Sequence, residues 1–429
     1  MREAQMAALK AAGMGATPAQ APPMPRNLAL SFAAASVFTL IDLFGPQAIG
    51  PALSSFYGIT PKLTGMALNV ATVGMATGAL LVAPLLARIG RKTVIVSVLL
   101  LLAVPTALLG TAPGLPVFVA LRLMQGLLMG AGFATTIAFV GEEWGPIGQA
   151  APLMAWYITG NVGANLFGRV TTGVIADAYG WRAGFLALGA ANLIGGFLLS
   201  RLLPAASREK TVRPIPSGAA FARQLADKRI IAACGVGFLI LFTFIGVFNY
   251  ANYRLAGPSF GVSVRGIGLL YVVFAASLAA TPLAGPVVAA FGQRRALMAG
   301  AIVCLLGSLL MLSTLLLAFM AGLALIGVGT FFCQAVATGF VSESAVGEKV
   351  AASGLYLATY YVGGMCGAVL MGLAFEQLPW SAFVMLVAAA FGLMLAVPAL
   401  AWPRHAVPIH EIGEIQMFGM RRVIRARGQ

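Results

Sequence analysis

Residues 84–92 read Pro84-Leu-Leu-Ala-Arg-Ile-Gly90-Arg-Lys92, and the pattern returns half a chain later as Pro286-Val-Val-Ala-Ala-Phe-Gly292-Gln-Arg-Arg295. Pro84 and Pro286 are 202 residues apart, and so are Gly90 and Gly292. Each copy leaves one long apolar run and enters the next through a short basic turn. A helix–basic turn–helix unit that repeats at half the chain length predicts a doubled protein. Doubled membrane proteins commonly place a site between their halves.

The composition of the 429-residue chain is that of a membrane protein. Hydrophobic residues make up 60% and charged residues only 9%, against roughly 25% charged residues in soluble domains, and the mean hydropathy is +0.94. Apolar stretches of about 20 residues, long enough to span a bilayer as helices, recur along the chain. The alternating pattern of a membrane β-barrel is absent from the sequence. The net charge is +15, and most of the basic residues lie in turns and tails beside apolar stretches. Basic residues at these positions set the orientation of a protein in the membrane, so the charge does not indicate nucleic-acid binding.

Twelve apolar stretches predict an all-α membrane protein with twelve transmembrane helices in two pseudo-symmetric six-helix bundles. The predicted helices are 28–50, 64–87, 93–111, 115–140, 149–175, 182–203, 230–253, 264–290, 296–316, 318–341, 350–374 and 380–402. The predicted domains are an N-terminal tail (1–27), a first bundle (28–203), a linker (204–229), a second bundle (230–402) and a C-terminal tail (403–429). Residues 218–228 in the linker predict an amphipathic surface helix. Gly45-Pro46 and Gly50-Pro51 are expected to bend the end of the first span.

The distribution of Lys and Arg predicts the orientation in the membrane. With the N-terminus inside, 21 of the 27 basic residues fall in inner segments and 4 in outer turns, and the remaining two lie within spans. Cytoplasmic segments of membrane proteins carry this excess of positive charge. Both termini and the central linker are therefore expected in the cytoplasm.

Three segments resemble the major facilitator superfamily of transporters. Residues 83–92 are similar to its signature Gly-x-x-x-Asp-Arg-x-Gly-Arg-Lys, which joins the second and third helices. Arg122-Leu-Met-Gln-Gly126-Leu-Leu-Met-Gly130 resembles the Arg-x-x-x-Gly motif in the fourth helix of proton-coupled members. Residues 157–161 and 248–255 resemble the YnfM-like, drug/proton-antiporter branch. The resemblance covers residues 28–402 and implies two six-helix bundles, a cytoplasmic linker and secondary transport.

The chain departs from the superfamily signature at two positions. Ala83 stands in place of the leading glycine, and Ala87 in place of an aspartate that, in the family, helps to lock the inner ends of the bundles together. We therefore expect a different inner lock, and Arg91 paired with Glu142 or Glu143 is one candidate. The fifth stretch also lacks the Gly-Pro of the family's antiporter motif. The predicted gating residues are Gly90, Arg91, Lys92, Glu142, Gly292 and Arg294.

Three charged residues, Asp42, Arg122 and Arg169, lie well inside predicted helices, where a charge costs about 2.5–3.5 kcal/mol on insertion scales. Their similar depth predicts one clustered site.

Asp42 is predicted to carry a proton together with Arg122, because a low dielectric favours the neutral acid and a nearby Arg favours the carboxylate. The alternative is a permanent structural ion pair. Arg122 is predicted to bind an anionic substrate group or to tune Asp42 through its bidentate fork, and its alternative role is helix–helix packing.

A polar stripe follows the fifth predicted helix, where Tyr157, Asn161, Asn165 and Arg169 recur every four residues on one face. Such a face is unfavourable against lipid, so it is expected to line the cavity or to form interhelical hydrogen bonds, and Arg169 could instead snorkel. The second half offers an uncharged, aromatic wall that suits an amphipathic or aromatic ligand, with ordinary packing as the alternative. The predicted substrate-binding residues are Arg122, Gln125, Tyr157, Asn161, Asn165, Arg169, Asn249, Tyr253, Gln334 and Tyr360.

These patterns predict a secondary active transporter that moves a small organic molecule by proton-coupled alternating access, with efflux favoured. Proton-coupled uptake or exchange of an organic anion is the alternative, and a non-transporting receptor or scaffold is a remote one. The sequence has no P-loop and no metal-ligand spacing, and both histidines lie in the C-terminal tail, so we expect no enzyme, metal or cofactor. We expect a monomer in the cytoplasmic (inner) membrane, with substrate, protons and the lipid bilayer as partners and no nucleic acid.

Overall fold

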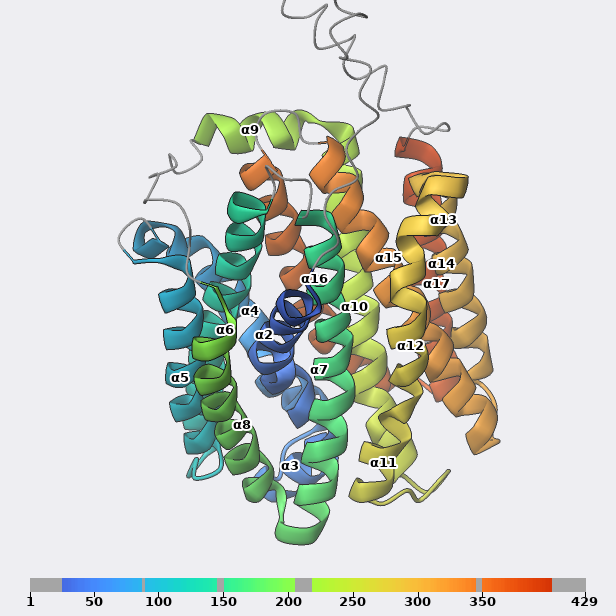
Figure 1. Cartoon of the computed structure of the whole chain (residues 1–429). Helices are drawn as coiled ribbons and strands as arrows, with labels where there is room; N and C mark the ends of the chain where they lie inside the picture. The colour runs from blue at the N-terminus through green and yellow to red at the C-terminus, as the bar shows by residue number, and fades with distance from the viewer. Residues whose placement is uncertain (1–24, 87–88, 145–149, 205–217, 345–348, 403–429) are drawn as a thin grey trace, which may run out of the picture.

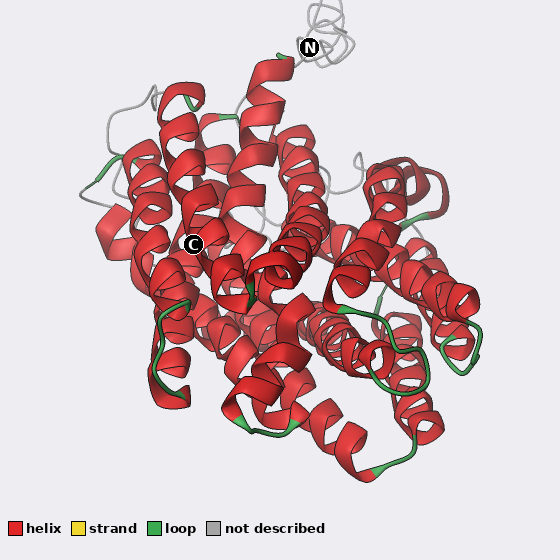
Figure 2. Cartoon of the chain, turned by 90° about the horizontal axis from the view of Figure 1, so that it is seen from below, coloured by secondary structure: helices red, strands yellow, loops and turns green. Residues whose placement is uncertain are grey.

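The computed structural model describes residues 25–86, 89–144, 150–204, 218–344 and 349–402 of the chain. These residues form helices joined by short turns, and none of the described residues forms a strand (Figures 1 and 2). The predicted C-terminal tail and nearly all of the predicted N-terminal tail lie outside the described ranges.

The first half of the chain contains six elements of membrane-spanning length. The first is a composite of three consecutive helical segments. The elements are α2 (Arg26–Phe44) with η1 (Gly45–Ile49) and α3 (Gly50–Tyr57), then α4 (Pro61–Leu86), α5 (Arg91–Leu109), α6 (Leu115–Glu143), α7 (Ala150–Tyr179) and α8 (Trp181–Leu202). A short helix, α9 (Gly218–Ala226), follows where the linker sequence predicts a surface helix.

The second half repeats this arrangement, and here the second element is the composite one. Its elements are α10 (Lys228–Ala256), the run of α11 (Val264–Leu270), η2 (Tyr271–Val273), α12 (Phe274–Ala280), η3 (Thr281–Leu283) and α13 (Ala284–Phe291), then α14 (Gln293–Leu310), α15 (Leu316–Ser344), α16 (Lys349–Gln377) and α17 (Trp380–Ala401). Among the described residues, ten segments are long and apolar enough to cross a membrane. The long helices α4 and α7 complete the set, so the predicted twelve-helix fold is confirmed.

The helices form two groups that meet along a central seam. In the first half α4 packs on α6, α2 on α7 and α5 on α8; in the second half α10 packs on α16, and α14 on α15 and α17. The halves meet mainly where α4 contacts α16 and where α7 contacts α11. Helix α9 lies across one end of the bundle, where it contacts α10 and α16 (Figure 1). We call this the α9 end, and the opposite end, seen in Figure 2, the far end.

At the Gly-Pro pairs a 3-10 segment interrupts the α-helix of the first span without ending the span. Helix α2 gives way at Gly45 to a 3-10 segment, and Pro51 stands in the first turn of α3. Proline is tolerated there because the first backbone N–H groups of a helix have no partner in the helix. The span therefore continues to Tyr57, beyond its predicted end at residue 50, and stops at Gly58, whose φ of 62° favours glycine.

Glycine determines how closely α4 and α6 approach. A methyl group at Gly126 would overlap the backbone of Ala71, and one at Gly130 would overlap the backbone of Met75. Helices in membranes associate by such close packing, because lipid supplies no hydrophobic driving force between them. The α4–α6 contact therefore depends on glycine at both positions.

We expect Gly126→Ala to lower the apparent melting temperature of the purified protein in detergent. The added methyl must push α4 and α6 apart, and overpacking of this kind typically costs about 1–3 kcal/mol. Gly235→Ala in α10 is the matched control, since a methyl there meets no atom within 4 Å. Equal melting temperatures for the two variants would contradict the importance of the close approach.

Candidate functional site

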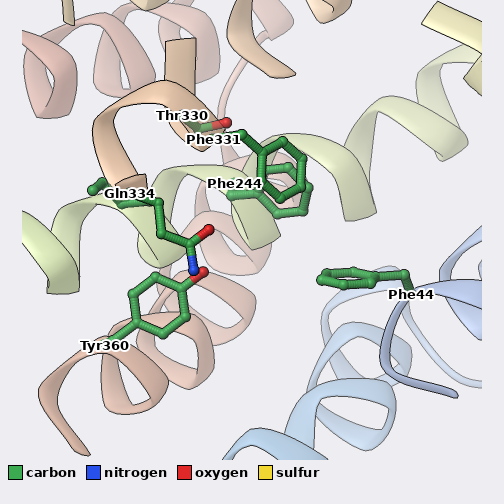
Figure 3. A pocket seen from close by; sticks show the side chains of 7 residues that line it. Phe44, Phe244, Thr330, Phe331, Gln334 and Tyr360 are labelled. Atoms are coloured by element: carbon green, nitrogen blue, oxygen red, sulfur yellow. The ribbon is translucent and has the colours of Figure 1, made fainter. Parts of the chain in front are cut away.

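A small pocket lies on the seam between the halves (Figure 3). Phe44 of α2 lines it from the first half; the lining residues from the second half are Ile240, Phe244, Thr330, Phe331, Gln334 and Tyr360. Its free volume is about 10 Å³, about what one water molecule needs. In Figure 3 the Gln334 amide and the Tyr360 hydroxyl point toward one another, and Phe44 approaches from across the pocket. This pocket, which we call the central pocket, is thus nearly closed.

Aromatic rings surround this pocket, with Phe244 at their centre. Its ring centroid lies 5.9 Å from that of Phe44, 5.4 Å from Phe331 and 4.6 Å from Phe248. Phe274 stands 4.9 Å from Phe248 and 6.0 Å from Phe331. The central pocket therefore carries aromatic surface and the polar groups of Gln334 and Tyr360, without a charged lining residue.

Arg122 lies fully buried inside the first half. Its Nε donates to the backbone carbonyl of Leu68 at 3.0 Å, and Nη2 donates to the same carbonyl. Nη1 donates to the backbone carbonyl of Asp42 at 2.8 Å and to Gln125 Oε1 at 2.7 Å. The planar guanidinium thus joins α6 to α2 and α4, and each of its nitrogens has a partner.

The Asp42 carboxylate is fully buried and faces α5 and α8. Asn192 donates to Asp42 Oδ2 at 2.6 Å and lies 3.3 Å from Thr106 Oγ1, which accepts from Gln125 Nε2 at 2.7 Å. Gln125 also accepts from Arg122, so these side chains form one polar network. The network joins five helices, α2, α4, α5, α6 and α8. Among the described residues, no ion pair joins the Asp42 carboxylate to Arg122, and Asp42 Oδ1 has no hydrogen-bond partner.

Arg169 belongs to a separate network, on the seam. Its Nε donates to Asn165 Oδ1 at 2.8 Å, and Nη2 donates to Gln47 Oε1. The backbone carbonyl of Gln47 accepts from Asn252 Nδ2 of α10, and Tyr271 donates to Asn252 Oδ1. This network therefore links the first half to the second. Arg169 therefore does not belong to the network of Asp42 and Arg122, although the three residues were predicted to form one site because of their similar depth in the membrane.

Aromatic faces cover the Arg169 guanidinium. Its central carbon lies 4.1 Å from the ring centroid of Tyr271, 5.3 Å from Phe248 and 5.7 Å from Phe274. Since Phe248 and Phe274 also contact the rings at the central pocket, Arg169 stands behind one aromatic wall of that pocket. The arginine does not snorkel to the surface, because its side chain is fully buried.

The other predicted polar residues are divided between several places. Tyr157 packs on Phe133 at 5.4 Å between ring centroids, and Asn161 lies buried on the same helix. Asn249 is buried, and neither its amide oxygen nor its nitrogen has a partner among the described residues. Tyr253 does not reach the central pocket but lines a second pocket of about 270 Å³ at the far end, with Arg254 and Trp380 among its neighbours.

At the far end the halves are in direct contact. The backbone N–H of Lys62 donates to Glu376 Oε1 at 2.8 Å. In a separate contact between the halves, Gly173 of α7 and Gly268 of α11 approach so closely that a methyl on either would meet the other's backbone. Together with Gln47 and Asn252, these contacts close the seam at this end.

The predicted gate at the α9 end is only partly described. Lys92 Nζ donates to the carbonyl of Leu203 within the first half. Gly90 and Gly292 both precede a helix, but only Gly292, with φ of 80°, has a conformation that favours glycine. Arg294 follows in the first turn of α14.

The side chain of Glu142 lies outside the described residues, so the expected pairing of Arg91 with Glu142 or Glu143 stays a prediction.

Sequence reasoning missed the amides and hydroxyls that complete both networks, namely Gln47, Thr106, Asn192 and Tyr271. A signal existed for Asn192, the single Asn in the apolar helix α8. Thr106 follows Pro105 inside α5, and Gln47 follows a Gly-Pro pair. Their partners come from distant helices, so no local pattern predicts the contacts.

Comparison with known proteins agrees with this architecture. The profile of the Major Facilitator Superfamily matches residues 28–257 and 236–423. The inner membrane transport protein YnfM of Escherichia coli (strain K12) is 29% identical over 89% of this chain and 91% of its own length. The MFS-type transporter YybF of Bacillus subtilis (strain 168) is 26% identical over 87% and 93%. The 4-hydroxybenzoate transporter PcaK of Pseudomonas putida is 32% identical over 38% of this chain and 37% of its own length. The chain belongs to the Major Facilitator Superfamily and is a multi-pass membrane transporter, not an enzyme.

Proposed function

We propose that this transporter moves a small organic molecule with an aromatic part by proton-coupled alternating access. The buried network around Asp42 is the observation that carries the proposal. Asp42 is the one buried acidic side chain in the described part of the chain. Its Oδ2 is held by Asn192, while no described residue bonds its Oδ1. A buried carboxyl group with one oxygen that has no hydrogen-bond partner is suited to take up and release a proton.

The network gives protonation of Asp42 a structural consequence. A proton on the carboxylate removes the network's negative charge and weakens its attraction for the Asn192 N–H. Helix α2 carries this change toward the seam, because Gln47 follows Asp42 by five residues and its carbonyl accepts from Asn252. The protonation state of Asp42 would thus bias the contact that closes the far end.

The closed far end fits one state of an alternating-access cycle. Transporters of this architecture expose a central site to each side in turn by rocking their halves. The seam is held here by a few hydrogen bonds and by glycine contacts, with no ion pair across it among the described residues. Separating these contacts breaks no ion pair, and Arg169 is the fully buried charged side chain on the seam among the described residues. The other state would open at the far end and close at the α9 end.

The aromatic lining of the central pocket supports an aromatic part in the substrate. PcaK, which resembles part of this chain, is named as a 4-hydroxybenzoate transporter. We keep efflux as the expected direction on the resemblance to the drug/proton-antiporter branch. Uptake or exchange of an organic anion is the second candidate, and the PcaK similarity favours it.

We also propose that the protein works as a monomer in the cytoplasmic membrane with both termini inside. The bias of 21 inner to 4 outer basic residues supports this orientation, and it places the α9 end in the cytoplasm. YnfM, similar over most of the chain, is named as an inner membrane protein.

We expect Asp42→Asn to abolish accumulation driven by a pH gradient in proteoliposomes while substrate exchange without a gradient continues. The amide cannot carry the proton but keeps a similar shape beside Asn192. Asp177→Asn, at the exposed far end of α7, is the matched control and should retain uphill transport. Undiminished uphill transport in Asp42→Asn would eliminate Asp42 as the coupling residue.

We expect Arg122→Lys to lower the initial rate of gradient-driven flux by about tenfold or more, because lysine cannot reproduce a fork that bonds two carbonyls and an amide. Arg182→Lys is the control, since Arg182 lies over the rings of Phe56 and Trp181 away from the network. Flux equal to wild type in Arg122→Lys would mean that the fork is not needed for coupling.

We expect Asn252→Leu to open the far end. The substitution removes the donor to the Gln47 carbonyl and the Asn252 Oδ1 acceptor of the Tyr271 hydroxyl, which keeps only the Phe248 carbonyl as an acceptor. Spin labels at the exposed residues Ser55 and Gln377 should report a population with a longer distance between α3 and α16.

Thr243→Val provides the control for that measurement. Thr243 is buried in the same helix, but its hydroxyl bonds only within α10, to the carbonyls of Leu239 and Ile240. It should leave the distance distribution unchanged. A distribution shared by wild type, Asn252→Leu and Thr243→Val would show that this hydrogen bond does not hold the far end closed.

A further inference from the structure

The described part of the chain buries three charged side chains, two guanidiniums and one carboxylate. Asp42, Arg122 and Arg169 are all fully buried. The carboxylate of Asp42 belongs to the network of Arg122. Arg169 has neither a hydrogen bond nor an ion pair to an acidic side chain in the described residues. One positive charge on the seam is therefore left without an opposite charge.

This imbalance is unusual on physical grounds. A buried charge is unfavourable unless it is paired, because the protein interior replaces water poorly as a solvent for ions. Aromatic faces and amide oxygens lower the cost for Arg169, since a guanidinium is attracted to the negative face of a ring. They supply partial charges only, and no full negative charge.

Two donors at this position are also open. Arg169 Nη1 and Asn165 Nδ2 are buried without a hydrogen-bond partner in the parts of the chain that the structure describes. Both belong to side chains on the same face of α7, one turn apart, and they are joined through Arg169 Nε and Asn165 Oδ1. A pair of unsatisfied donors, one of them cationic, matches the oxygens of a carboxylate.

We propose that Arg169 and Asn165 bind the carboxylate of an aromatic carboxylate substrate. This assignment rests on the proposed transport function and names its substrate class. The ring of the substrate would lie against Phe44 and Phe244 in the central pocket. The carboxylate would reach past Phe248 and Phe274, the rings that separate the pocket from Arg169 in this closed state.

The same geometry assigns different tasks to the two buried arginines. Arg122 uses four of its five N–H groups on carbonyls and an amide of its own half, and each of its nitrogens is bonded, so a ligand would compete with the network for this side chain. Arg169 stands on the seam with a free donor. The anion-binding role therefore falls to Arg169, and Arg122 supports the proton site.

Thermal unfolding of the purified full-length protein with benzoate or benzamide tests the assignment. The two probes share ring and shape and differ in charge. Benzoate should raise the melting temperature with increasing concentration, as a ligand of the folded state does, and benzamide should act much more weakly. Arg169→Gln should weaken benzoate binding by about tenfold or more and remove its advantage over benzamide. Arg182→Gln should keep that advantage.

A second variant covers the case in which Arg169→Gln does not fold. Asn165→Leu keeps the guanidinium but removes the amide donor together with the Oδ1 acceptor of Arg169 Nε, and it should weaken benzoate binding by a smaller factor. Benzoate binding unchanged in the variants that fold, equal effects of benzoate and benzamide on wild type, or no effect of either would overturn the assignment. Benzoate binding through Arg169 without gradient-driven benzoate flux would count against proton-coupled transport and leave the anion site standing.

Discussion

The cost of a charge in the membrane interior is the constraint on which the central part of this structure depends. Each fully buried charged group must find donors, acceptors or opposite charge inside the protein, because lipid offers none. Arg122 meets this demand by bonding the carbonyls of Leu68 and Asp42. Asp42 meets it through Asn192. Five helices of the first half are therefore held in a defined relation around these two side chains.

The seam between the halves is built differently. At the far end α4 contacts α16 and α7 contacts α11, with the hydrogen bond from the Lys62 N–H to the Glu376 carboxylate in the first contact and the close approach of Gly173 and Gly268 in the second. Separating these contacts leaves no buried ion behind, because Glu376 is exposed. Arg169 is the exception, since it lies on the seam as a buried cation. An anion bound beside Arg169 would neutralise this buried positive charge at the interface between the halves. Substrate binding would in this way be coupled to rocking of the halves.

Much of the fold could be predicted because the membrane imposes a length on each apolar stretch. The helices follow the predicted spans closely, and α9 lies where the linker predicts a surface helix. The first span is longer than predicted because Pro51 lies in the first turn of α3, a position where proline is favoured and does not end the helix. Gln47 lies in the 3-10 segment within this span, where it contacts Arg169 and Asn252.

Hydrophobicity, repeats and charge can be read along a chain without its three-dimensional structure, so they were enough to predict the doubled twelve-helix architecture, the family and the three intramembrane charges. The sequence by itself could not determine how those charges are grouped. Similar depth suggested one site, but the direction in which each side chain leaves its helix sends Asp42 and Arg122 into the first bundle and Arg169 into the seam. Tertiary packing decides that direction, since Asn192, Thr106 and Tyr271 come from helices far apart in sequence.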